Sequence, residues 1–245
     1  MSEVNYQRRS VKAACANCGV LELCLPLGLT GQEVERLDQM ILQRIKVKKG
    51  NALYRTSDPF SALYAVRIGS FKTTVLTVDG REQVTGFQIC GEMLGLDAIS
   101  SGAHAGNAFA LEDSEVCPIH YRHLERLARD LPSLQQNLNK IFSREIVRDH
   151  EVLMMLGNMS SDERLGAFLL NLSQRLSMRG YSSSHFVLKM YREDIGSYLG
   201  LRLETICRSI AHLRELGLVE ISGREVNIQN MEGLRQLITG CHHLR

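Results

Sequence analysis

The stretch from residue 192 to residue 213 has the pattern of two short helices joined by a tight turn. Ile195 and Leu199 give the first helix an apolar face, and Gly200 tolerates the backbone conformation that a tight turn needs. Apolar residues then recur at helical spacing along a second helix, at Ile206, Ile210 and Leu213. Residues 218–228 follow as a β-hairpin around Ser222-Gly223-Arg224. The combination predicts a winged helix-turn-helix, in which the second helix enters the major groove of DNA.

The outward face of this second helix carries side chains suited to reading bases. Glu204, Cys207 and Arg208 follow the i, i+3, i+4 spacing of one helix face. Arg208 can donate two hydrogen bonds to guanine, and Glu204 can accept one from the amino group of cytosine. The alternative is an ordinary corner of two helices with a surface Glu204–Arg208 ion pair. Because the turn, the apolar anchors and the hairpin occur together, we predict DNA as a partner.

Three cysteines, Cys15, Cys18 and Cys24, crowd into ten residues near the other end of the chain. The chain has 7 cysteines, an odd number, so disulfides cannot pair them all. In a reducing compartment, clustered cysteines bind metal or act in redox chemistry more often than they form structural disulfides. The spacing alone leaves an iron–sulfur cluster and a zinc ion open, since both take four thiolates. A fourth ligand must come from elsewhere in the chain.

Composition limits the remaining possibilities. The 245 residues hold 29 basic and 27 acidic side chains, so a nucleic-acid surface must be local. The polar, basic residues 1–14 lack the apolar core of a signal peptide, and no apolar run approaches the length of a membrane span. These features predict a cytoplasmic protein without a membrane partner. No nucleophile–base motif, P-loop or dinucleotide fingerprint is found, which argues against an enzyme.

Between residues 46 and 121 short apolar runs alternate with turn signals, a pattern typical of an antiparallel sandwich or jelly roll. Asp79-Gly80 is the strongest hairpin signal among them. A helix is expected from Thr30 to Ile45, with Thr30 as N-cap. The expected fold is α+β, in four parts: a cysteine-rich segment, a β-roll, a long helix and a winged helix domain, at residues 1–29, 30–130, 131–160 and 161–245.

The long helix carries an apolar seam at heptad-like spacing, which predicts a parallel homodimer. The alternative is that the helix packs on its own domain. Asp149 interrupts the seam and would face its own copy, where two carboxylates repel each other. We therefore expect Asp149 to weaken the dimer until a signal supplies the missing stability of the dimer. The seam begins at Leu131 and Leu138, and the predicted interface is formed by Phe142, Ile146, Asp149, Leu153 and Leu156.

These features together resemble the FNR (fumarate and nitrate reduction) branch of the cyclic AMP receptor protein superfamily. The resemblance covers nearly the whole chain and rests on the cysteine spacing, Leu25-Pro26-Leu27, the roll, the long helix and Glu-Thr-Ile-x-Arg in the second helix. It implies that Cys117 is the fourth ligand and that the four thiolates hold an oxygen-labile [4Fe–4S] cluster. It also implies a cluster-dependent dimer on TTGAT-N4-ATCAA sites, contact of RNA polymerase with the roll near Thr77 to Glu82, and Asp149 as a restraint on dimerisation.

Two positions depart from what the family pattern implies. Cys207 occupies the place where the family normally has serine, and a thiol is a weaker hydrogen-bond partner than a hydroxyl. One base contact is therefore expected to differ. In addition, residues 106–110 lack the arginine that pairs with the phosphate of a cyclic nucleotide. A buried phosphate without that partner is costly, so we expect no cyclic AMP binding and a roll that serves as scaffold.

Overall fold

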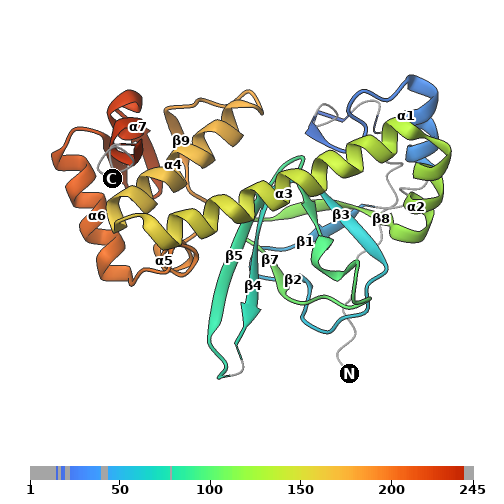
Figure 1. Cartoon of the computed structure of the whole chain (residues 1–245), viewed down its shortest axis with the longest axis horizontal. Helices are drawn as coiled ribbons and strands as arrows, with labels where there is room; N and C mark the ends of the chain where they lie inside the picture. Colours follow the sequence, from blue (N-terminus) through green and yellow to red (C-terminus); the bar gives the residue numbers. More distant parts are fainter. Residues whose placement is uncertain (1–14, 16–17, 20–22, 40–43, 78, 240–245) are drawn as a thin grey trace. The chain divides into compact units, whose positions relative to one another are not determined.

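The computed structural model divides the chain into two compact units, residues 1–145 and 146–245 (Figure 1). The long helix α3, Pro132–Asn158, crosses the boundary between them. The structure describes residues 15, 18–19, 23–39, 44–77 and 79–239.

The first unit contains two four-stranded antiparallel sheets, which confirms the predicted roll. One sheet has the order β1-β8-β3-β6 and the other β2-β7-β4-β5. Apart from β4 and β5, the strands that pair within each sheet are distant in the sequence, as in a jelly roll. The strands are β1 Ile45–Val47, β2 Ala52–Tyr54, β3 Ala62–Ile68, β4 Ser70–Leu76, β5 Glu82–Ile89, β6 Met93–Leu94, β7 Asn107–Ala110 and β8 Ser114–His120.

The hairpin predicted at Asp79-Gly80 joins β4 to β5, with Leu76 opposite Glu82. Gly80 has a φ of 81°, a left-handed conformation that suits glycine. The backbone amide of Thr77 donates to the carbonyl of Arg81 and closes the turn. The local turn chemistry therefore sets the register of this hairpin, as the sequence suggested.

Helix α1 runs over Gly31–Asp38 and begins at the predicted cap. The Thr30 hydroxyl accepts from the backbone of Glu33, whose carboxylate accepts from the Thr30 amide. The prediction that this helix reaches Ile45 was wrong, because Ile45 begins β1 and pairs with Val116. Strand pairing in the roll overrides the helical pattern at that point. Residues 40–43, which the predicted helix includes, lie outside the described residues.

A buried core joins the roll to the helices beside it. Leu25 and Leu37 pack with β3, with helix α2 (Tyr121–Asp130) and with the first part of α3. Leu131 and Leu138 are only 7% and 5% exposed within this core. Their predicted place in a dimer seam was therefore wrong, because the roll covers that face of the helix. In this first part of α3 the helix packs on its own domain, as the alternative prediction had it.

The second unit is a helical domain with a small sheet. Its three strands have the order β10-β11-β9, so the predicted hairpin gains a third strand. The last helix was not anticipated from the sequence. The elements are α4 Ser161–Ser177, β9 His185–Val187, α5 Arg192–Leu199, α6 Leu203–Glu215, β10 Val219–Ser222, β11 Glu225–Ile228 and α7 Met231–Thr239. Across the described part of the chain, no helix is both long and apolar enough to cross a membrane.

The close approach of β7 and β4 gives a test of the roll. A Cβ atom on Gly106 would stand 2.5 Å from the carbonyl oxygen of Thr74, a backbone atom that cannot move aside cheaply. Gly106→Ala should lower the free energy of unfolding by about 1–3 kcal/mol, as measured by urea titration with circular dichroism. Gly31→Ala, whose Cβ meets nothing within 4 Å, is the control and should leave stability unchanged or higher. Equal stability of both variants would contradict the packing described.

Candidate metal centre and nucleic-acid interface

The first unit brings together four cysteines from two distant parts of the sequence. Cys15, Cys18 and Cys24 belong to the cysteine segment before α1, and Cys117 lies on β8 opposite Ala65 of β3. Cys15, Cys24 and Cys117 all pack against the same apolar core. All four side chains are partly buried, and none is in a disulfide.

Electrostatic effects link the four thiols to one another. Burial raises the pKa of Cys24 to about 12, and the neighbouring charges of Cys117 and Cys18 act in the same direction. The pKa of Cys117 rises to about 11, mainly through burial, with Cys18 again contributing. The pKa of Cys15 is raised by burial, by the Asp38 carboxylate, and by Cys24 and Cys117. The four sulfur atoms therefore lie near enough to influence each other's charge.

The donor set suits a thiolate-bound group. Four thiolates are the usual ligand set of a [4Fe–4S] cluster, and they also suit a zinc ion. Among the described residues, no three His, Cys, Asp or Glu side chains are gathered closely enough to hold one metal ion. Cys15, Cys18, Cys24 and Cys117 are the residues that would hold such a group.

Two contacts hold the cysteine segment in place. The buried Asn137 side chain on α3 donates hydrogen bonds to the carbonyl oxygens of Leu25 and Leu27, directly after Cys24. On the other side, a Cβ atom at Gly91 would stand 2.8 Å from Cβ of Leu23, so the segment packs closely on the turn between β5 and β6. Neither contact was predicted. An asparagine among leucines on a packed helix face is the signal that could have indicated the first.

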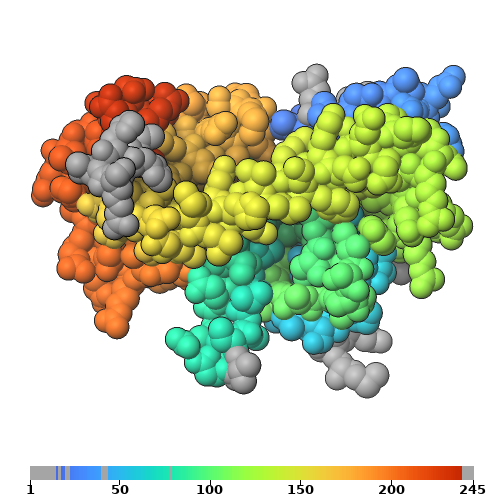
Figure 2. Space-filling model, viewed as in Figure 1, coloured from blue at the N-terminus to red at the C-terminus, as the bar shows by residue number. Residues whose placement is uncertain are grey.

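The later part of α3 has an exposed apolar surface. Ile146 and Leu153, both in the predicted interface, are 55% and 66% exposed, and Asp149 between them is exposed. Phe142 is partly buried against the core of the first unit. Leu156 is also partly buried, and its side chain lies near Gly200 of the second unit. Figure 2 shows atoms of α3 on the surface of the face in view.

The helix-turn-helix has the predicted elements and one further constraint. Gly200 ends α5 in the left-handed conformation, with φ 64°. The amide of Leu201 then donates to the carbonyl of Gly196 at 2.8 Å. A Cβ atom on Gly196 would stand 2.7 Å from the Leu201 carbonyl oxygen, so glycine is required there as well. The sequence reading identified Gly200 and overlooked Gly196.

The predicted base-reading residues lie in the first two turns of α6. Glu204 and Arg208 are exposed, whereas Cys207 is partly buried. Nη1 of Arg192, on α5, stands 3.7 Å from the Cys207 sulfur. Arg208 contacts the Thr205 hydroxyl at 3.4 Å, a long hydrogen bond that leaves its guanidinium able to engage another acceptor. Ile206, Ile210 and Leu213 are buried and fix the helix on its unit.

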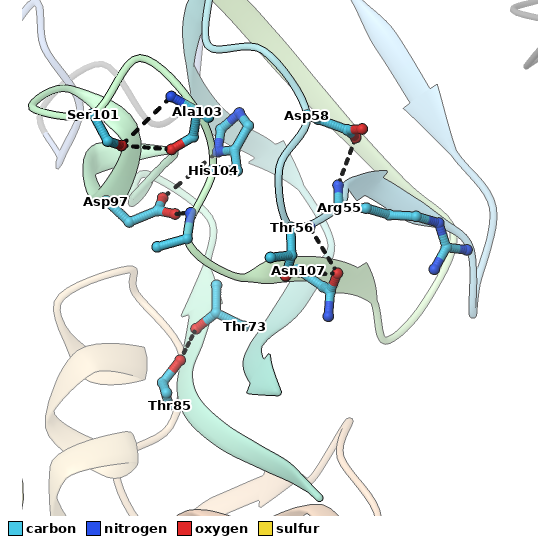
Figure 3. A network of polar contacts seen from close by, with 11 residues as sticks. Arg55, Thr56, Asp58, Thr73, Thr85, Asp97, Ser101, Ala103, His104 and Asn107 are labelled. Carbon is cyan, nitrogen blue, oxygen red and sulfur yellow. Dashed lines mark hydrogen bonds and ion pairs between the residues drawn. The ribbon is translucent and has the colours of Figure 1, made fainter. Parts of the chain in front are cut away.

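Several polar groups around β7 contact one another within the roll (Figure 3). Oδ1 of Asn107 accepts from the backbone amide of Thr56 at 3.0 Å. The ring of His104 stacks on Tyr54 with centroids 3.7 Å apart, and the Asp97 carboxylate accepts from the amide of Ala105. These contacts engage some of the polar groups next to residues 106–110 within the protein.

Comparison with known proteins agrees with this architecture. A model of the cyclic nucleotide-binding domain matches residues 44–130, and a model of the Crp-like helix-turn-helix domain matches residues 163–237. The chain is 47% identical to the transcriptional regulatory protein btr of Bordetella pertussis, over 92% of this chain and 93% of that one. It is 39% identical to the fumarate and nitrate reduction regulatory protein of Escherichia coli K12, over 91% and 89%.

Among solved structures, FixK2 of Bradyrhizobium japonicum matches with a TM-score of 0.73 and 29% identity, covering 80% of this chain and 96% of that one. The fold and the matched domains define a DNA-binding regulator of transcription, a class that is not enzymatic. The chain belongs to the Crp/Fnr family of transcription regulators. The family resemblance inferred from the sequence is thereby confirmed.

The link between α3 and the cysteine segment can be tested through Asn137. Asn137→Ala leaves the carbonyls of Leu25 and Leu27 without their donor, which should lower the free energy of unfolding by about 1–3 kcal/mol. It should also speed the reaction of Cys24 with a thiol reagent in metal-free protein. Gln135→Ala, which removes only an exposed contact to Asn139, is the control. Unchanged thiol reactivity in both variants would show that Asn137 does not hold the segment.

Proposed function

We propose that this protein is an oxygen-responsive regulator of anaerobic genes that binds DNA as a dimer when it carries a [4Fe–4S] cluster. The observation that carries the proposal is the meeting of four thiols from two distant parts of one unit, in a chain that also has a winged helix-turn-helix. Relatives named for anaerobic and for fumarate and nitrate reduction regulation support the biological setting. We expect the protein to act in the cytoplasm, where thiols stay reduced.

Coupling from the thiols to the long helix follows from the contacts of the chain itself. When bound, the cluster supplies covalent links between the cysteine segment and β8 that oxygen can break. Cys24 adjoins Leu25, whose carbonyl is held by Asn137 of α3. The hydroxyl of Ser133, also on α3, donates to the Glu33 carboxylate of α1 at 2.8 Å. A shift of the cysteine segment is therefore transmitted to the first turns of α3.

The dimer is proposed to form along the exposed part of α3. Ile146 and Leu153 present apolar surface that a second copy of the helix would remove from water. Asp149 lies between them and opposes this association through repulsion of the two carboxylates. The cluster-loaded form then has to supply the missing stability. Two copies of α6 would enter successive major grooves about one helical turn apart.

For DNA, we propose TTGAT-N4-ATCAA sites with Glu204, Cys207 and Arg208 as the reading residues. The exposure of Glu204 and Arg208 on α6 supports this assignment. RNA polymerase is a further proposed partner, reached through the loop between β4 and β5. Cyclic AMP is not a proposed ligand, since residues 106–110 lack an arginine to pair with its phosphate.

The deciding experiment is anaerobic purification followed by iron and sulfide assays, an absorption spectrum and gel filtration before and after air. We expect about four irons and four sulfides per chain, a visible band that air bleaches, and loss of the dimer on bleaching. Cys117→Ser should prevent cluster retention, whereas Cys90→Ser, at a thiol that donates to the Arg67 carbonyl, should not. A colourless, air-stable zinc protein would overturn the proposal and leave a zinc-stabilised regulator.

Asp149→Ala should strengthen the dimer of the metal-free protein. Removing the repulsion between the two carboxylates is expected to lower the dissociation constant by about five- to thirtyfold, the equivalent of 1–2 kcal/mol. Sedimentation equilibrium of the apo protein measures this change. His150→Ala, at the neighbouring exposed position, serves as the control and should behave as wild type. An unchanged monomer–dimer equilibrium in Asp149→Ala would refute the role of this carboxylate.

Arg208→Ala should weaken binding to TTGAT sites by about 1–3 kcal/mol, because a bidentate contact to guanine is lost. Fluorescence anisotropy with anaerobic, cluster-loaded protein provides the measurement, and discrimination against a changed guanine should fall in parallel. Arg235→Ala, on α7, removes an exposed arginine from the same unit without touching α6. If both variants lose the same affinity and neither loses specificity, Arg208 acts only as a general positive charge.

In the same assay, Cys207→Ser tests the departure from the family pattern. A hydroxyl is the stronger hydrogen-bond partner, so we expect tighter binding to TTGAT sites. Unaltered affinity and site preference would mean that the thiol is neutral at this position.

A further inference from the structure

A cluster of charged side chains lies beside Cys117 of strand β8. Glu115 and Cys117 are two residues apart, so their side chains point to the same face of the strand. The Glu115 carboxylate lies 2.8 Å from Nη1 of Arg67 and 3.6 Å from Nε of Arg44. Two arginines thus share one carboxylate, which leaves a local excess of positive charge next to a cysteine.

The strand register explains how both arginines reach this place. On β1, Ile45 pairs with Val116, so continuing the antiparallel register by one residue sets Arg44 opposite Cys117. On β3, the register with β8 shifts between Val66 and Ile68, and Arg67 lies at that irregularity. A β-bulge of this kind re-aims a side chain that regular pairing would direct elsewhere.

The group is only partly accessible to water. The side chains of Arg44, Arg67 and Glu115 are 16%, 25% and 13% exposed, so water screens their charges weakly. The Nε atoms of both arginines are buried and make no hydrogen bond among the described residues, with Nε of Arg44 only in ion-pair range of Glu115. Two buried donors without acceptors are costly to a fold unless another group uses them.

An iron–sulfur cluster on four thiolates would supply the acceptor atoms and the negative charge that the two arginines lack. A [4Fe–4S]²⁺ core with four thiolates carries roughly two net negative charges and has sulfur atoms that accept hydrogen bonds. We propose that Arg44 and Arg67 act as positioning residues that stabilise the negative charge of the cluster at Cys117. Glu115 orients the two guanidinium groups and limits their effect. This inference rests on the proposed function.

The test compares how fast variants lose the cluster to an iron chelator in the absence of oxygen. Absorbance of the cluster reports the loss. Arg44→Gln should lose the cluster at least about fivefold faster than wild type, since one nearby positive charge is removed from a poorly screened site. Arg44→Lys keeps the charge and should stay within about twofold of wild type. Lys48→Gln is the matched control, because it breaks an exposed ion pair with Asp113 in the same unit.

Glu115→Gln separates an electrostatic role from a merely structural one. It breaks the same ion pairs as Arg44→Gln but leaves the arginine charge less neutralised, so cluster loss should be no faster than in wild type. If Glu115 and the arginines only held the strands together, Glu115→Gln and Arg44→Gln would both accelerate the loss. That result would overturn the inference.

The remaining outcomes are also decisive. A wild-type protein that holds the cluster, with Arg44→Gln indistinguishable from Lys48→Gln, overturns this inference and leaves the proposed function standing. A wild-type protein that takes up no iron and sulfide overturns both. Should Arg44→Gln fail to fold, as circular dichroism of the apo protein would report, Arg67→Gln and Arg67→Lys provide the same comparison.

Discussion

The burial of Leu25 is the constraint on which the first unit depends. Its side chain is fully buried between the roll and α3, and its carbonyl accepts a hydrogen bond from the buried Asn137. Because Leu25 directly follows Cys24, the apolar core fixes the end of the cysteine segment without any metal. Cys24 is therefore held by packing against the same core that Cys15 and Cys117 contact.

The contact between Asn137 and Leu25 also links the thiols to the long helix in the proposed switch. Asn137 lies on the part of α3 that packs against the roll, and the exposed apolar positions lie further along the same helix. A helix transmits a rotation or shift along its length because its backbone hydrogen bonds make it stiff. In the proposed switch, a change at the thiols would reach Ile146, Asp149 and Leu153 along this helix.

Helix α3 also shows why sequence periodicity was a partial guide. Leu138, Phe142, Ile146 and Leu153 follow one apolar pattern, yet Leu138 is buried against the roll while Ile146 and Leu153 are exposed. One apolar stripe thus serves two different surfaces. Periodicity reports that a face is apolar, but it does not report what covers that face, since the covering residues come from distant parts of the chain.

Local signals in the sequence determined the elements whose causes are local. These include the cap at Thr30, the turn at Asp79-Gly80 and the helix-turn-helix with its glycine at position 200. Only the tertiary structure decided which residues from distant segments meet: Asn137 with Leu25, Leu23 with Gly91, and Arg44 and Arg67 with Glu115 beside Cys117. Such pairs depend on strand register and on packing between elements, and neither leaves a mark in the neighbouring residues of the sequence.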